Sequence, residues 1–158
     1  MLDRFERFSL SIFEITRYWH KITSDEMEKY GLKGPHSIYL LAMHQHPEGV
    51  TASQLGELCG RDKADVSRMV SIMEDKGLVT RECVAKNLYR GLLKLTEDGT
   101  AAAEYVCQRV MVAVELASKG LDEMRRKTFY EALDLISGNL RRISTDGLPE
   151  SLIPKENA

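Results

Sequence analysis

The sequence holds 158 residues, of which 43% are hydrophobic, and it carries a formal net charge of −2 with a pI near 6.1. This length and apolar content suffice for one folded domain with a sizeable core, which argues against a disordered chain, and the near-neutral charge excludes a protein that is basic over its whole surface. Any face that binds nucleic acid therefore has to be a local patch.

The cysteines and the apolar runs indicate where the protein works. Cys59, Cys83 and Cys107 lie far apart without a CxxC pair, which is typical of a reducing compartment. The first residues, "MLDRFERFSL", contain charges throughout, so no signal peptide is expected. No run approaches the roughly 18 apolar residues of a membrane span. We therefore expect a soluble, cytoplasmic protein with no membrane partner.

The first predicted element is a long helix from Asp3 to about Tyr30, a stretch without Pro or Gly. Its apolar residues repeat with the spacing of a heptad seam, made of Phe5, Phe8, Ile12, Ile15, Trp19 and Ile22. Further apolar residues off the seam give this helix more apolar surface than one intramolecular contact covers. Residues 1–34 are therefore predicted to form an N-terminal dimerisation helix.

Two shorter helices are predicted next. "GLKGPHS" breaks the first helix, and Pro35 suits the first turn of a helix that runs to about His46. Its predicted inner face consists of Ile38, Leu41 and Ala42. Thr51 then caps the helix of "TASQLGELC", with Gln54 at the position of the capping-box partner. Leu55 and Leu58 are expected to point inward from this helix.

A fourth helix begins after the turn at Gly60, with Asp62 as the predicted N-cap, and ends at Gly77. Its apolar residues fall at i, i+3, i+4 and i+7, which predicts a buried stripe of Val66, Met69, Val70 and Met73. The opposite side is polar or small, and it comprises Lys63, Ala64, Asp65, Ser67, Arg68 and Ser71.

The pattern then changes to two runs of β-prone residues, "LVTRECV" and "LYRGLLKL", joined by the polar "AKN", which predicts a small hairpin. Thr96 caps a further long helix, and a last helix runs from Leu121 to about Thr145. The predicted fold is mainly α with one β-hairpin. Its parts are residues 35–97 as a winged helix-turn-helix lobe, 98–145 as C-terminal dimerisation helices and 146–158 as a flexible tail.

The order of these elements points to DNA. A helix of this size fits the major groove, where each base pair presents its own donor and acceptor pattern, and a hairpin that follows it can reach adjacent phosphates or the minor groove. A single amphipathic helix with a polar face is more often only a core helix. The capped helix, the turn, the second helix and the hairpin together are a much more specific combination.

These residues resemble the MarR (multiple antibiotic resistance regulator) family over nearly the whole chain. Leu55, Glu57 and Leu58 match its second lobe helix, "DKADVSRMVSIMEDKGLVTR" is similar to its recognition helix and first strand, and "LKLTEDG" resembles the segment after its wing. The resemblance implies a homodimeric transcription regulator, usually a repressor released by a small ligand, an oxidant or a metal.

Some positions depart from the family's pattern. Ala64 and Asp65 stand where the family tends to have two hydroxyl residues, and Ile72 stands where it often has a basic one. The wing reads "KNLYRG", in which Lys86 and Arg90 remain basic. The predicted DNA-binding residues are Lys63, Ala64, Asp65, Ser67, Arg68, Ser71, Lys86 and Arg90.

By resemblance, three kinds of effector site come into question. His36 and His44 lie eight residues apart, but the long helix after the wing supplies no further His, so no metal site is predicted. The first helix has no Cys for an oxidant sensor. By resemblance, an organic effector is expected in a pocket lined by Tyr18, His36, Tyr39 and Met43.

The predicted function is therefore a homodimeric, sequence-specific DNA-binding regulator of a pseudo-palindromic operator, a repressor released by a small organic effector. No cofactor is expected, and no catalytic arrangement is legible, so an enzyme is not predicted. Two alternatives stay open: a winged-helix dimerisation or adaptor module that binds protein, and a regulator that responds to zinc.

Overall fold

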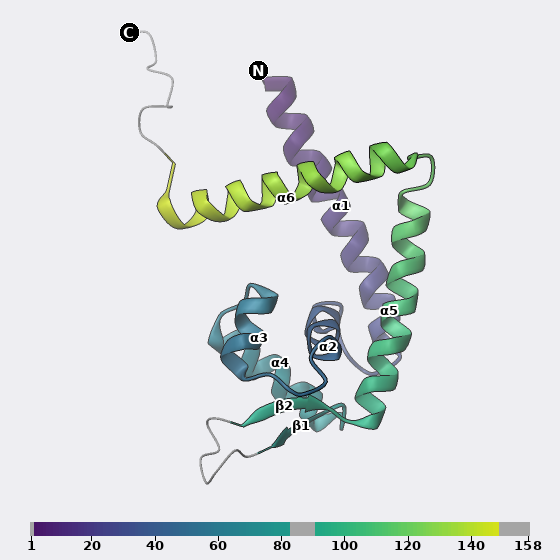
Figure 1. Ribbon diagram of the computed structural model, residues 1–158, viewed down its shortest axis with the longest axis vertical. Coiled ribbons are helices and arrows are strands. Elements are labelled where there is room, and N and C mark those ends of the chain that lie inside the picture. The colour runs from purple at the N-terminus through teal and green to yellow at the C-terminus, as the bar shows by residue number, and fades with distance from the viewer. Residues whose placement is uncertain (1, 83–90, 149–158) are drawn as a thin grey trace. The chain divides into compact units, whose positions relative to one another are not determined.

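The structure, a computed structural model, describes residues 2–82 and 91–148 (Figure 1). The elements in chain order are α1 (Leu2–Glu28), α2 (His36–His44), α3 (Ala52–Cys59), α4 (Lys63–Asp75), β1 (Val79–Glu82), β2 (Leu92–Leu95), α5 (Glu97–Ala117) and α6 (Glu123–Asp146). This order confirms the predicted class, mainly α with one antiparallel hairpin. The chain divides into two compact units, Met1–Val114 and Glu115–Ala158, and each is described by itself.

Side-chain caps fix where α3 and α4 begin. The Thr51 hydroxyl accepts the amide of Gln54 at 3.2 Å, and the Gln54 side chain accepts the amide of Thr51 at 2.9 Å. At the start of α4, the Asp62 carboxylate accepts the amide of Asp65 at 2.8 Å. These bonds satisfy amides that have no partner inside the helix, and both caps confirm the sequence predictions.

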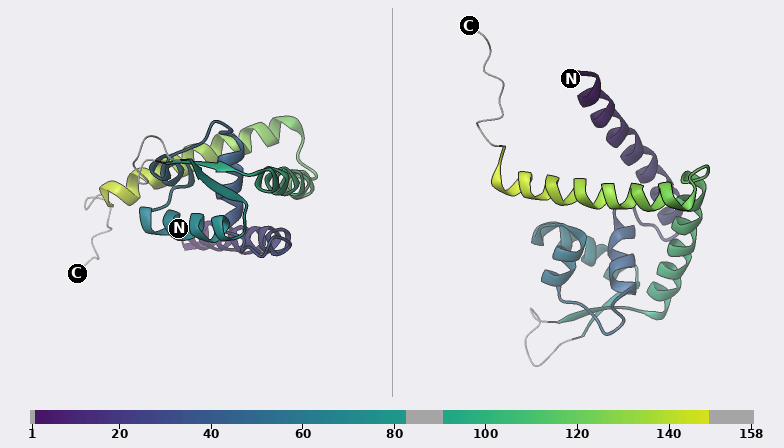
Figure 2. Two further views of the ribbon diagram at one scale, coloured as in Figure 1. Left: turned by 90° about the horizontal axis from the view of Figure 1, so that it is seen from below. Right: turned by 45° about the horizontal axis from the view of Figure 1, so that its top comes forward.

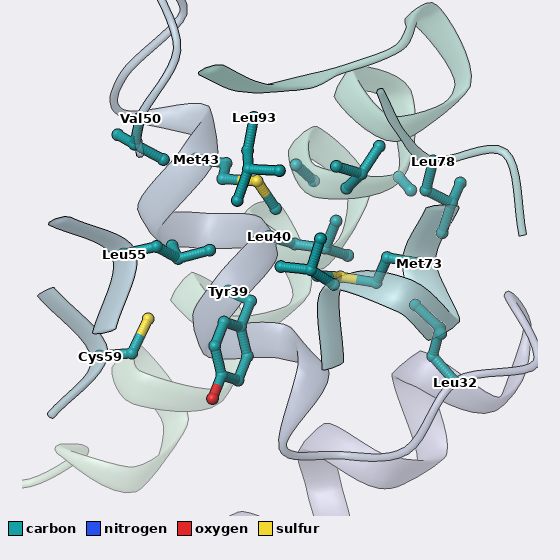
Figure 3. Packing of buried hydrophobic residues seen from close by; sticks show 14 of the residues in the cluster. Leu32, Tyr39, Leu40, Met43, Val50, Leu55, Cys59, Met73, Leu78 and Leu93 are labelled. Atoms are coloured by element: carbon teal, nitrogen blue, oxygen red, sulfur yellow. The ribbon is translucent and has the colours of Figure 1, made fainter. Parts of the chain in front are cut away.

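The core of the first unit gathers apolar side chains from α1 to α5 (Figure 3). Leu40 of α2, Met73 of α4 and Leu93 of β2 have no exposed surface. Figure 2 shows from two further sides that α2, α3, α4 and the hairpin form one lobe around this core. The lobe therefore holds α4 by its apolar side and leaves its polar side outward.

Two predicted inward positions are wrong. Ile38 is 42% and Leu58 51% exposed, whereas Tyr39 and Leu40 fill the core from α2. Helix α2 is thus rotated by about one residue from the predicted inner face, and Tyr39, Leu40 and Met43 are its side chains in the core.

The hairpin pairs β1 with β2 in antiparallel register, with Val79 opposite Leu95. Val50, in the loop before α3, adds a bridge to Leu93 through two main-chain hydrogen bonds of 3.0 and 2.8 Å. The wing is therefore anchored to the loop between α2 and α3 as well as to α4.

The start of α5 lies directly on the turn that follows α4. The Thr96 hydroxyl donates to the carbonyl of Gly77 at 2.7 Å, and the Thr96 amide donates to the carbonyl of Leu78 at 3.1 Å. A Cβ on Gly99 would come within 1.9 Å of the Leu78 carbonyl oxygen. Only glycine permits this close approach.

In both units, apolar side chains remain at the surface. On α1 the seam residues Phe5, Phe8, Ile12, Ile15 and Ile22 are all exposed. On α6 the exposed apolar residues that share one helical face are Phe129, Leu133, Ile136, Leu140 and Ile143. No helix among the described residues is both long enough and apolar enough to cross a membrane.

Candidate nucleic-acid interface

The outer side of α4 carries the polar residues that the sequence predicted. Lys63, Ala64, Ser67, Arg68 and Ser71 are exposed, while the other side of the helix buries Val66, Val70 and Met73. Because the buried stripe fixes the rotation of the helix, these five side chains point to solvent together. Lys63 forms no ion pair with any residue in the ranges 2–82 and 91–148, so its charge is available to a phosphate.

Asp65 is the exception on this face, since only 18% of its side chain is exposed. Its Oδ2 accepts the hydroxyl of Tyr39 at 2.7 Å, and its Oδ1 accepts Nη2 of Arg68 at 2.6 Å. Nε of Arg61 lies 3.9 Å from Oδ2. The hydrogen bonds from Tyr39 and then from Arg68 lower the pKa of Asp65, so this carboxylate is ionised at neutral pH.

Asp65, predicted among the DNA-binding residues, makes its contacts inside the protein. The N-cap of α4 is supplied by Asp62, and the carboxylate of Asp65 is instead tied to Tyr39, 26 positions earlier in the chain. Local spacing gives no signal for a partner at that separation. Tyr39 and Arg61 are therefore the residues of this face that sequence analysis missed.

The wing residues Lys86 and Arg90, predicted to bind DNA, lie outside the described residues, as does Cys83. The strands that lead to the wing are described. Arg81 of β1 pairs with Glu74 of α4 at 3.4 Å, and Lys94 of β2 pairs with Glu82 at 2.8 Å. The first pair joins the hairpin to the C-terminal end of α4, and the second links its two strands.

The four predicted pocket residues do not lie together at one surface. His36, Tyr39 and Met43 are buried core residues of α2, whereas Tyr18 is half exposed on α1. His36 keeps one notable feature: its Nε2 is buried and finds no hydrogen-bond partner in the described part of the chain. Burial lowers the pKa of this imidazole, so the ring is neutral at pH 7.

Two observations in the described ranges bear on metal and thiol chemistry. There, no three His, Cys, Asp or Glu side chains lie close enough together to hold a metal ion. Cys59 is buried at the end of α3, and this burial raises the pKa of its thiol to about 11. Such a thiol is protonated at neutral pH and reacts slowly with oxidants.

Comparison with known families identifies the lobe. Residues 30–86 match the model of the MarR family, a span that runs from the end of α1 through α4 into the wing. The resemblance seen in the sequence is thus confirmed over the region that carries the candidate interface.

Solved structures share the fold over most of the chain. A MarR transcriptional regulator from Methanosarcina mazei Go1 is 20% identical, with a TM-score of 0.76 over 87% of this chain and 99% of that one. A protein from Listeria monocytogenes in complex with a 26mer DNA is 22% identical, with a TM-score of 0.77 over 89% and 95% of the two chains. S. aureus MepR in its DNA complex is 16% identical, with a TM-score of 0.77 over 84% and 97%.

Proposed function

Because residues 30–86 of this chain belong to the MarR family, we propose that the protein is a transcription regulator that binds double-stranded DNA as a homodimer. The observation that carries the proposal is the outer side of α4, where Lys63, Ser67 and Arg68 stand together on a helix fixed by its buried stripe. Two of the similar structures, from Listeria monocytogenes and S. aureus, contain DNA. The helix enters the major groove, and the wing contacts the adjacent backbone.

The chemistry of each side chain indicates which part of the DNA it contacts. Arg68 reads a base, since its planar guanidinium can bond a guanine edge in two places, while Ser67 and Ser71 offer hydroxyls to bases or phosphates. Lys63, Lys86 and Arg90 neutralise phosphates. Two-fold symmetry of the dimer makes the operator pseudo-palindromic.

We also propose that the protein is a repressor released by a small organic ligand, not by zinc. The support is His36, whose buried Nε2 is a polar atom that a ligand can satisfy, beside the aromatic ring of Tyr39 on the same helix. Entry of a ligand here requires that core side chains rearrange. Zinc and chelators should accordingly leave DNA affinity unchanged.

The test is DNA binding by the full chain and by three variants, measured by fluorescence anisotropy. The duplexes are the DNA upstream of the protein's own gene and a scrambled version, each at several salt concentrations. Arg68→Ala should cost about 1–3 kcal/mol on the operator and relax the preference at one position. Lys63→Ala and Lys86→Ala should weaken all duplexes alike and flatten the salt slope by about one unit each.

A second candidate function, a protein-binding adaptor, is favoured by one observation. The charges of Arg68 and Arg61 are partly offset by Asp65, which lowers the positive charge of this face. A dimeric protein that binds neither duplex at low salt would support the adaptor and contradict DNA regulation.

A further inference from the structure

We propose that Asp65, held between the hydroxyl of Tyr39 and the guanidinium of Arg68, is a positioning residue that sets how strongly the protein prefers its operator over other DNA. This inference rests on the proposed DNA-binding function. An anion on a helix that faces DNA repels phosphates. The inference gives a reason why Asp65 stands there.

The first support is the origin of the two bonds. Tyr39 has no exposed surface and belongs to the packed core of α2, so its hydroxyl is a fixed point. Through the 2.7 Å bond to Oδ2, this fixed point sets the position of the Asp65 carboxylate. Asp65 in turn holds Nη2 of Arg68 at 2.6 Å, and Arg68 itself is 65% exposed. An outward arginine is thus oriented by a contact that begins in the core.

The second support is that the bond to Asp65 leaves other N–H groups of Arg68 free to donate. A guanidinium has five N–H groups in a rigid fork, and the bond to Asp65 engages the Nη2 end. The remaining donors are available to a base edge. An arginine whose side chain is ordered before binding loses less conformational entropy on contact than a free one, and it presents its donors in one geometry.

The third support is charge. An unpaired arginine attracts every phosphate equally, which strengthens binding to all sequences. With Asp65 beside it, Arg68 gains less from a phosphate and keeps its gain from a matching base. Specificity is a difference of two affinities, so a carboxylate that weakens the non-specific one raises the preference for the operator.

The alternative that Asp65 only stabilises α4 is not favoured by the contacts. The bond that caps the first turn is made by the Asp62 carboxylate, which accepts the amide of Asp65 at 2.8 Å. The carboxylate of Asp65 makes its two short bonds away from the helix amides, to a core hydroxyl and to an exposed guanidinium.

The experiment compares the parent chain with Asp65→Asn, Tyr39→Phe and a control, Asp75→Asn. Asp75 is exposed at the other end of α4, and its replacement changes the net charge by the same amount as Asp65→Asn. Each protein is titrated with operator and scrambled duplexes at several salt concentrations. Circular dichroism and thermal melting check that each variant is folded.

Asp65→Asn should bind the scrambled duplex several-fold more tightly, and its operator-to-scrambled ratio should fall by about 5-fold or more. Tyr39→Phe keeps the charge and loses only the anchor, so its operator affinity should fall while its affinity for the scrambled duplex stays at the parent value. Asp75→Asn should keep the parent ratio.

Two results would overturn the inference while leaving DNA binding intact: an unchanged ratio in folded Asp65→Asn and Tyr39→Phe, or an equal loss of ratio in Asp75→Asn, which would mean that net charge alone matters. A parent chain that binds neither duplex would overturn the proposed function and this inference together.

Discussion

His36 is an imidazole that the fold keeps uncharged. Only 1% of the residue is exposed, and its Nδ1 lies 3.1 Å from the amide nitrogen and 3.0 Å from the carbonyl oxygen of Lys33. Burial lowers its pKa, and this outweighs the smaller opposite effects of the Lys33 backbone and of Asp65. The unfolded chain has no such burial, so its imidazole takes up a proton at a higher pH than the folded chain does.

The free energy of unfolding should therefore fall as pH decreases below about 6.5, the ordinary pKa of histidine. In that range the unfolded state binds the extra proton, and linkage favours it until the pH drops below the lowered pKa of the folded state. Above about 6.5 this contribution to stability is fully present. Urea unfolding of the parent and of His36→Gln between pH 5 and 8 checks the effect.

The variant His36→Gln should lose this part of the pH dependence, and the control His20→Gln, at an exposed position on α1, should keep it. An equal slope in the parent and in His36→Gln would mean that other groups cause the acid sensitivity.

At the scale of single residues, the sequence predicted side-chain orientations that depend on one helix. It missed those that depend on contacts between two helices. The outward set on α4, from Lys63 to Ser71, follows from the spacing of its own apolar residues. The inward set on α2 does not, because its apolar residues leave no clear polar side and only its packing against other elements fixes its rotation. For the same reason the bond from Tyr39 to Asp65 has no signature in either segment.

At the scale of elements, the capping side chains in the sequence predicted where helices begin. The hydroxyl at Thr51 with Gln54 three residues on, and the carboxylate at Asp62, predicted two helix starts that the structure confirms. The bridge between Val50 and Leu93 was not predicted, since a single extended residue in a loop shows no alternation and its partner lies 43 positions away in the numbering.

The contact between Gly99 and Leu78 predicts a large effect of one methyl group. Gly99→Ala places a Cβ 1.9 Å from a main-chain oxygen, so the backbone of α5 or of the turn has to shift. Overpacking of this kind costs about 1–3 kcal/mol of unfolding free energy. Chemical denaturation of the purified variants measures it.

Gly138 is the matched control. It lies within α6, and a Cβ there would meet no atom within 4 Å. Gly138→Ala should raise stability by about 0.4–1 kcal/mol, because alanine favours a helix over the unfolded chain. If Gly99→Ala is as stable as the parent, α5 packs against the turn less closely than the structure shows.

At the scale of the whole molecule, the exposed apolar faces of α1 and of α6 lead us to expect a homodimer. Each face holds several large side chains in contact with solvent, which is more than a monomer normally leaves uncovered. A second copy of the chain offers the same faces, so a symmetric dimer covers both. The heptad spacing on α1 made this the clearest sequence prediction about assembly, and it stays a prediction.

Replacing Ile15 by Glu tests the dimer. Ile15 lies on the seam of α1 and is 64% exposed, so the variant keeps its fold as a monomer but puts a charge into the interface. Sedimentation at micromolar concentration should show a dimer for the parent and a monomer or a greatly weakened dimer for Ile15→Glu. Leu10→Glu, equally exposed but off the seam, should remain dimeric.

A parent chain that sediments as a folded monomer at that concentration would contradict the homodimer. Equal weakening by Ile15→Glu and Leu10→Glu would place the interface on a different side of α1.

The start of α5 packs against the turn after α4, and this contact fixes the angle between the two helices. Thr96 and Gly99 hold the start of α5 against the turn after α4, so we expect a rotation of α5 to carry α4 with it. In the proposed dimer, such a movement would change the separation of the two α4 helices. Successive major-groove sites on one side of DNA recur about every 10–10.5 base pairs, and a pair of helices set wider or narrower than that no longer fits both half-sites. Release from DNA would then follow from a changed spacing of the two α4 helices, and each lobe would stay fully folded.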